Sequence, residues 1–316
     1  MKLGKLAYIS DLRTIWKHEE KEFTPWLADN ITLLGEALGI DLEVISVEHD
    51  VGAFSLDILA KDSGSGNIVA IENQLEITDH SHLGQIITYA SGVDAKTVVW
   101  ISKEVREEHR KAIDWLNQIT NEETEFFAIE IQLIIVDDSS PAPFFKVKAS
   151  PNDWSKEQKG KLNKTENISE RQEDYHRFFI ALLELIHIEM PGFTNSKKVG
   201  HDSWKTFPAG ISGISYSIAF RTGNRMSCEL YFDVGSKDIN KERYDNIFLY
   251  KDEIEKTLGA LSWERLDDRN ASRIAVYKDY TNETDMVNWA LEKLKSFRDC
   301  FKGYISLACS AKPNDQ

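Results

Sequence analysis

The chain has few cysteines and no long apolar run. Its three cysteines, Cys228, Cys300 and Cys309, are odd in number and form no CxxC pair, which argues against a disulfide framework and a cysteine-based zinc site. No apolar stretch approaches the roughly 18 residues that cross a bilayer, and the N-terminus lacks the apolar core of a signal peptide. We therefore expect a cytoplasmic protein with free thiols and no membrane partner.

Basic residues are scarce in the first half of the chain. Residues 1–150 hold 13 Lys and Arg against 26 Asp and Glu, a net charge of −13, and residues 151–316 hold 25 against 26, a net charge of −1, which together give −14. Such an acidic half argues against broad, nonspecific binding of nucleic acid, which rests on basic surface. It leaves open a cluster of carboxylates that must bind cations before it accepts phosphate.

Helical and strand patterns alternate through residues 1–150. Apolar residues recur at helical spacing from Thr24 to Leu38, with Pro25 suited to the first turn and Gly39 to the end. The predicted order is helix, three strands, helix, strand, helix, strand, which indicates an α/β domain with a mixed central sheet flanked by helices. The later elements are expected as strands 42–47, 53–61, 68–75, 97–101 and 126–136, and as helices 79–91 and 105–119.

A connector is expected after this domain. Residues from Ser139 to Lys164 are rich in Pro and Lys, which predicts an irregular segment. We therefore divide the chain into a domain at 1–150, a linker at 151–169 and a second, α+β domain at 170–310. In the second domain we expect helices 170–188, 240–258 and 284–301 and strands 211–220, 226–234 and 272–277.

Two acidic residues lie within apolar strands. Asp57 stands between Leu56 and Ile58, and Glu72 follows Ile71 on the next strand, across a predicted hairpin. A carboxylate in a buried strand is costly unless it is paired or binds a metal. The pair therefore predicts a site for Mg²⁺ or Mn²⁺, which would polarise a phosphoryl oxygen and lower the pKa of a bound water. The alternative is two solvated residues on an exposed sheet face.

Two neighbours of Glu72 could complete such a site. Gln74 lies two residues further on and therefore on the same face of the strand, where it could orient a water molecule. Asn73 points away, but its backbone carbonyl could reach a cation held between the carboxylates. We therefore include Gln74 among the candidate catalytic residues and the Asn73 carbonyl among the candidate metal ligands.

Three residues on helices are further candidates. Gln85 and Tyr89 lie four residues apart on one face of a predicted helix, where they could position water or phosphate or simply form helix surface. Glu36 lies late in the first helix among apolar neighbours. It could assist the metal, or it could be a solvated helix residue.

Several other patterns have two interpretations. Asp79, His80 and His82 could bind a metal or could form a helix N-cap with exposed histidines. Arg221 and Arg225 flank a hairpin turn and could contact phosphate or simply aid solubility. In the second domain, four aromatic residues could stack against bases or could form the core: Trp204, Phe207, Tyr216 and Phe220.

The order of the first-half motifs resembles a known superfamily. Glu36, Asp57, Glu72-Asn73-Gln74 and Gln85-xxx-Tyr89 resemble the PD-(D/E)xK nucleases, and the Gln-xxx-Tyr helix is similar to that of the RecB-like exonucleases. The stretch Ile71 to Gln85 looks like a bacterial family known as domain of unknown function 4268, whose second-half domain would be residues 170–310.

The resemblance implies a restriction-endonuclease-like fold and Mg²⁺- or Mn²⁺-dependent hydrolysis of phosphodiester bonds, in DNA rather than RNA. A role in bacterial restriction, repair or anti-phage defence would follow, and a homodimer is compatible with it. The superfamily usually has Lys where this chain has Gln74, and Pro where it has Leu56. The rival hypothesis is a nuclease fold without catalysis, kept as a nucleic-acid-binding or assembly module.

Overall fold

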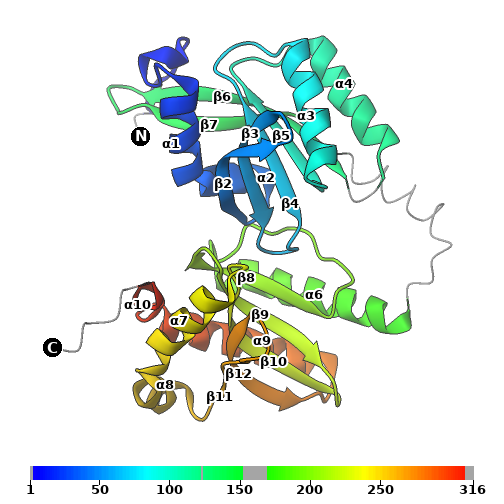
Figure 1. Cartoon of the computed structure of the whole chain (residues 1–316), viewed down its shortest axis with the longest axis vertical. Helices are drawn as coiled ribbons and strands as arrows, with labels where there is room; N and C mark the ends of the chain where they lie inside the picture. Colours follow the sequence, from blue (N-terminus) through cyan, green and yellow to red (C-terminus); the bar gives the residue numbers. More distant parts are fainter. Residues whose placement is uncertain (1–2, 122–123, 152–168, 310–316) are drawn as a thin grey trace. The chain divides into compact units, whose positions relative to one another are not determined.

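The computed structural model describes residues 3–121, 124–151 and 169–309. The chain divides into two compact units, drawn in Figure 1, which are described here one at a time. The first contains a seven-stranded sheet and the second a five-stranded sheet. Residues 152–168 of the predicted linker lie outside the described residues.

The sheet of the first unit is mixed. Its strands follow the order β1-β6-β5-β4-β3-β2, and β7 pairs with the outer side of β6. The pairs β2–β3 and β3–β4 are antiparallel, whereas β4–β5 and β5–β6 are parallel. The α/β class predicted from the sequence is therefore confirmed. The strands are β1 Leu6–Ile9, β2 Leu42–Val51, β3 Phe54–Asp62, β4 Ile68–Asn73, β5 Thr97–Ser102, β6 Glu125–Val136 and β7 Ala142–Ala149.

Helices cover both faces of this sheet. The helices α1 (Thr24–Asp29) and α2 (Ile31–Leu38) enclose one apolar core, which contains Leu27, Leu34, Ile58 and Ile71. On the other face, α3 (His80–Gly92) and α4 (Glu107–Ile119) lie next to each other and enclose a second core with Tyr89, Trp100 and Ile113 (Figure 1). Period-two alternation in the strands sends successive side chains into these two cores.

Two predictions for the first unit need correction. The helix expected at 24–38 is interrupted at Asn30, whose φ and ψ of −115° and 27° are not helical. The connector expected from Ser139 contains strand β7, which pairs antiparallel with β6. Pro143 misled the prediction, because β7 is an edge strand and an edge strand tolerates proline.

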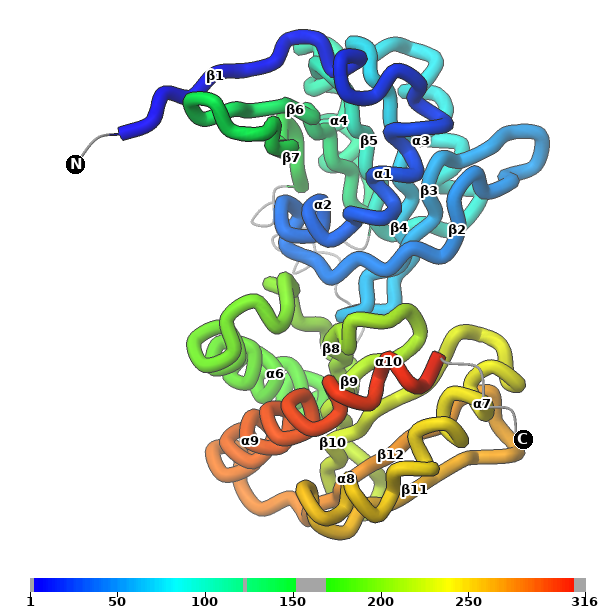
Figure 2. Tube along the Cα trace, turned by 90° about the vertical axis from the view of Figure 1, so that its left-hand side faces the viewer, coloured from blue at the N-terminus to red at the C-terminus, as the bar shows by residue number. Residues whose placement is uncertain are grey.

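The second unit packs its helices on one face of an antiparallel sheet, whose strand order is β11-β12-β10-β9-β8. Apolar side chains from one face of the strands, such as Phe207, Ile218 and Leu230, meet Leu182 and Leu294 from the helices. The long helices α6 and α9 lie side by side, as Figure 2 shows. The elements are α6 Glu170–Glu189, β8 Trp204–Ile211, β9 Ile214–Arg221, β10 Arg225–Phe232, α7 Lys237–Phe248, α8 Lys251–Leu258, β11 Ser262–Glu264, β12 Ser272–Asp279, α9 Glu283–Phe301 and α10 Ile305–Ala308.

Most elements of the second unit were predicted, with four differences. The helix expected at 240–258 is two helices, because Tyr250 leaves the helical conformation between them. Strands β8 and β11 and helix α10 were not expected. Among the described helices, none is long and apolar enough to cross a membrane.

Candidate metal centre

Strand register brings acidic side chains together in the first unit. The β3–β4 register pairs Ile58 with Ile71, so its continuation places Asp57 opposite Glu72. The backbone N–H of Asn73 donates to Asp57 Oδ2 at 2.7 Å and fixes that carboxylate at the end of β4. The β2–β3 register in turn places Glu48 opposite Asp57. Three acidic residues therefore stand in a row across three neighbouring strands.

The protein environment disfavours the charged forms of two residues in this row, Asp57 and Glu72. Burial, together with the charges of Glu48 and Glu19, raises the pKa of Asp57 to about 7, although the hydrogen bond from the Asn73 N–H opposes this rise. Burial and then the charge of Asp57 raise the pKa of Glu72 to about 9. Glu72 is only 5% exposed. A cation between the two carboxylates would remove this penalty, because it would stabilise both charged forms.

Helix α3 presents polar groups to the same place. Burial and the charges of Glu72 and Asp57 raise the pKa of Tyr89, while the nearby Gln85 amide lowers it. Three of the six buried side-chain atoms without a hydrogen-bond partner among the described residues lie here: Glu72 Oε2, Gln85 Oε1 and Tyr89 OH. Buried polar atoms without partners are rare and costly, and they indicate a place for water, an ion or a ligand. The structure therefore brings Asp57, Glu72, Gln85 and Tyr89 together.

Gln74 is already fully engaged by the protein. Its Nε2 donates to the carbonyl of Ile77 at 2.9 Å and to Asp79 Oδ2 at 3.3 Å, and its Oε1 accepts from the indole N–H of Trp100 at 2.8 Å. The oxygen and nitrogen of this amide cannot exchange places, because the indole N–H can only donate a hydrogen bond and the backbone carbonyl can only accept one. The predicted role of Gln74 in orienting water would require one of these bonds to open.

The side chains of Asn73 and Glu36 do not lie beside Asp57 and Glu72. The Asn73 side chain lies on the opposite face of the sheet, where Nδ2 donates to Thr24 Oγ1 at 3.0 Å. Its backbone carbonyl as a metal ligand stays a prediction. Glu36 is exposed on α2, and the structure does not bring it to the pair. The neighbouring acids that act on Asp57 and Glu72 are instead Glu19 and Glu48.

The sequence contained a signal for Glu48 but not for Glu19. Strands β2 and β3 are joined at Gly52, whose φ of 65° is left-handed. A tight hairpin at this glycine sets the register and therefore the residue opposite Asp57. Glu19 lies in a π-helical turn (Glu19–Phe23) that no periodicity marks, and its Oε2 accepts from the Leu75 N–H at 2.5 Å.

The donor set fits Mg²⁺ or Mn²⁺. Within the described ranges, no three His, Cys, Asp or Glu side chains stand where they could hold a metal together. Glu48 instead accepts a hydrogen bond from Ser55 Oγ at 3.1 Å. Mg²⁺ keeps several waters and is typically held by one or two carboxylates together with substrate phosphate oxygens. Asp57 and Glu72 supply two carboxylates, and the unpartnered Glu72 oxygen is free to bind the ion.

The neighbouring Asp79 cluster is a helix cap. The Asp79 carboxylate accepts from the His82 N–H at 3.0 Å at the start of α3, which confirms the N-cap interpretation. His82 Nδ1 lies 2.7 Å from the second oxygen of Asp79. His80 turns to His109, with 3.0 Å between the two ring nitrogens. This cap fixes the start of the helix that carries Gln85 and Tyr89.

Replacing Gln74 with leucine should destabilise the first unit by about 2–3 kcal/mol, because the Trp100 indole N–H and the Ile77 carbonyl would lose their partner. Gln118→Leu, on the exposed face of α4, is the matched control and should change stability by less than about 0.5 kcal/mol. Urea unfolding measures both. Equal stability of the two variants would show that the Gln74 bonds contribute nothing.

The fold and the acidic pair define a two-unit protein, with an α/β unit that holds a candidate metal centre and an α+β unit. Residues 174–305 match a family described as "Domain of unknown function (DUF4268)", which confirms the resemblance to that family. No protein of curated function matches the chain.

Two solved structures show partial similarity to the chain. One is a repair endonuclease from Pyrococcus abyssi, at 17% identity and a TM-score of 0.27, over 31% of this chain and 43% of that one. The other is EndoMS in complex with dsDNA, at 17% identity and a TM-score of 0.28, over 35% of this chain and 44% of that one. The chain therefore matches less than half the length of either structure.

Proposed function

We propose that this protein is a metal-dependent nuclease that hydrolyses phosphodiester bonds of DNA. The observation that carries the proposal is the buried Asp57–Glu72 pair, whose pKa values are raised by burial and whose Glu72 oxygen has no partner. Two buried carboxyl groups whose charged forms are disfavoured are a costly arrangement for a merely structural role. Perturbed titratable groups of this kind are typical of functional sites.

Each residue at the site has a distinct proposed role. Asp57 and Glu72 would hold Mg²⁺ or Mn²⁺, which when bound polarises a phosphoryl oxygen and lowers the pKa of a water molecule. The Gln85 Oε1 atom has no partner and would accept a hydrogen bond from the attacking water. The Tyr89 hydroxyl would donate to a phosphate oxygen. Gln74 would hold the end of β4, and with it Glu72, through its bonds to Trp100 and Ile77.

The sequence motifs support the same function. The order Asp57, Glu72-Asn73-Gln74, Gln85-xxx-Tyr89 resembles the PD-(D/E)xK nucleases, and strand register and helix α3 place these residues on adjoining elements. DNA as the substrate, and a place in bacterial restriction, repair or anti-phage defence, follow from that resemblance. We keep both as parts of the proposal.

One observation favours a second candidate, a nucleic-acid-binding module without catalysis. The superfamily usually has Lys where this chain has Gln74, and both ends of the Gln74 amide are hydrogen-bonded within the protein. A neutral, engaged amide cannot supply positive charge to a transition state. The unpartnered Gln85 and Tyr89 atoms favour the enzyme, because they leave polar groups for water and phosphate.

Cleavage assays separate these candidates. Linear, circular and single-stranded DNA and a matched RNA should be incubated with the full chain in Mg²⁺, in Mn²⁺ and in chelator. We expect metal-dependent cleavage of DNA, and cutting of the circular form would identify an endonuclease. Binding of DNA without cleavage of any substrate in either metal would support the binding module instead.

A further inference from the structure

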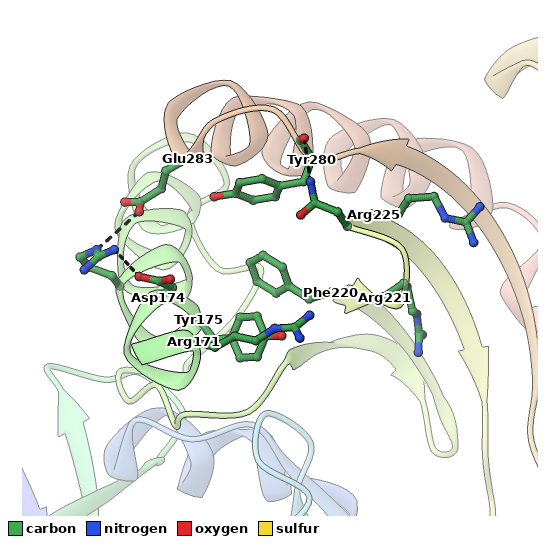
Figure 3. Close-up of a pocket in the computed structure, with 10 residues that line it drawn as sticks. Arg171, Asp174, Tyr175, Phe220, Arg221, Arg225, Tyr280 and Glu283 are labelled. Carbon is green, nitrogen blue, oxygen red and sulfur yellow. Dashed lines mark hydrogen bonds and ion pairs between the residues drawn. The ribbon is translucent and has the colours of Figure 1, made fainter. Parts of the chain in front are cut away.

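A cavity of about 240 Å³ opens in the second unit. It lies among the first turns of α6, the turn between β9 and β10, and the segment that leads from β12 into α9 (Figure 3). Its lining combines aromatic rings with arginines. Neither the metal centre nor the proposed nuclease chemistry uses any of these residues.

Three half-buried aromatic rings form one part of the cavity. The rings of Tyr175 and Phe220 lie 4.4 Å apart, and those of Phe220 and Tyr280 lie 5.8 Å apart. In Figure 3, Phe220 lies between the two tyrosines. Partly exposed rings gathered at one cavity provide apolar surface against which a flat ligand can stack.

The four aromatic residues that the sequence offered for either base stacking or the core have different positions in the structure. Phe207 and Tyr216 are buried in the core, at 0% and 2% exposure. Phe220 packs against the core with part of its ring and lines the cavity with the rest. Trp204 is exposed and does not line the cavity. The core interpretation is therefore confirmed for Phe207 and Tyr216, and Phe220 is the one of the four that could stack against a ligand in this cavity.

The charged residues of the cavity do not cancel. Both acidic residues of the cavity form ion pairs with Arg177, which lies 2.6 Å from Asp174 and 3.5 Å from Glu283. Arg171 and Arg225 contact no carboxylate among the described residues. The guanidinium carbon of Arg171 lies 5.6 Å from the ring centre of Tyr175, and that of Arg225 lies 5.3 Å from the ring centre of Tyr277, which does not line the cavity. Positive charge is therefore left over in a chain whose net charge is −14.

Strand pairing adds a second sign of an anionic ligand. Arg221 and Arg225 are directly opposite each other at the ends of β9 and β10. Like charges in that position are destabilising. Buried Glu229 offsets part of this charge, because it accepts a hydrogen bond from Arg221 Nε at 3.0 Å. Arg225 has no such partner among the described residues, and an anion at the cavity rim would offset its charge.

We propose that this cavity binds a nucleoside phosphate. The base would stack against Tyr175, Phe220 and Tyr280, and the phosphate would contact Arg171 and Arg225, whose side chains are long enough to turn toward the rim. The cavity is smaller than the roughly 300–1,000 Å³ of pockets for drug-sized ligands, which limits the occupant to about one nucleotide. That nucleotide could be free or could be one unit of a single strand.

Titration calorimetry in metal-free buffer tests this proposal on the full chain. The probes are deoxyadenosine monophosphate, deoxyadenosine, inorganic phosphate and a decamer of deoxyadenosine. We expect the nucleotide-containing probes to bind more tightly than deoxyadenosine or phosphate alone. Tighter binding of the decamer than of the monophosphate would identify a strand as the source, and equal binding would identify the free nucleotide.

Variants locate the binding. The double variant Arg171→Gln/Arg225→Gln and the variant Tyr175→Leu should each weaken binding by about tenfold. Arg269→Gln removes the same charge from an exposed arginine outside the cavity and should leave binding unchanged. Unaltered binding in both cavity variants, deoxyadenosine binding as tightly as its monophosphate, or no binding of any probe would each overturn the proposal. DNA cleavage is not measured here, so failure of this proposal leaves the nuclease proposal standing.

Discussion

Replacing Glu72 with glutamine should lower the rate of metal-dependent DNA cleavage by at least about 1,000-fold. The substitution keeps the shape of the side chain but removes the charge that would hold the cation. A metal ion contributes several kcal/mol of transition-state stabilisation, and about 4 kcal/mol corresponds to that loss in rate. Asp57→Asn should have a similar effect, because the two carboxylates face each other across β3 and β4.

A neighbouring glutamate supplies the control for this experiment. Glu76 is four residues from Glu72, and its side chain is 63% exposed in an ion pair with Arg13. Glu76→Gln removes the same charge and should leave the cleavage rate within about twofold, since exposed ion pairs contribute little. Full activity of Glu72→Gln would remove Glu72 from the catalytic site.

The same substitution should stabilise the metal-free protein. Without a cation, Glu72 and Asp57 can ionise only against burial and mutual repulsion. Glu72→Gln should therefore raise the free energy of unfolding at pH 9 by about 3 kcal/mol, the scale of an uncompensated buried charge. In calorimetric scans, the transition of the first unit should move upward by roughly 5–10 °C. A variant less stable than the parent at pH 9 would contradict this expectation.

The gain in stability from neutralising Asp57 and Glu72 should increase as pH rises. The folded state holds the two protons more tightly than the unfolded chain, because burial raises the pKa of Asp57 from 3.8 to about 7 and that of Glu72 from 4.5 to about 9. The pair therefore lowers stability progressively as pH rises between these ordinary and raised values. The difference between the parent and Asp57→Asn/Glu72→Gln should be near zero at pH 4 and largest at pH 9.

Together the two effects describe a site that costs stability and supports function. If the carboxylate had a purely structural role, the protein would lose stability when that carboxylate is neutralised, because its hydrogen bonds would weaken. If the carboxylate is a metal ligand, its neutralisation should make the metal-free protein more stable and should abolish the metal-dependent activity. The two measurements on one variant therefore distinguish these roles, and neither depends on knowing the natural DNA sequence that the protein cleaves.

Much of the first unit could be predicted from periodicity alone. The alternation in β3 and β4 and the hairpin between them placed Asp57 near Glu72, because pairing across a tight turn fixes which residues are opposite. The four-residue spacing placed Gln85 and Tyr89 on one helix face. Periodicity does not say which strand a helix face meets, and so it could not decide whether Glu36 approached the acids.

Other features of the site depend on contacts between residues distant in the sequence. Gln74 is held by Trp100, 26 residues away, and nothing local to Gln74 indicates that partner. The cavity of the second unit combines α6, the β9–β10 turn and the residues before α9. Strand β7 was missed for a different reason, since its one proline, Pro143, is disfavoured in strands generally but tolerated at a sheet edge.

The central claim is that Asp57 and Glu72 together bind a divalent cation. Calorimetric titration of the metal-free chain with Mn²⁺ at pH 8, in two buffers of different ionisation enthalpy, tests it most directly. We expect binding with release of a proton, because Glu72 is mostly protonated at that pH, and loss of both binding and proton release in Glu72→Gln. Equal Mn²⁺ binding by the parent and by Glu72→Gln, or no binding by the parent, would contradict it.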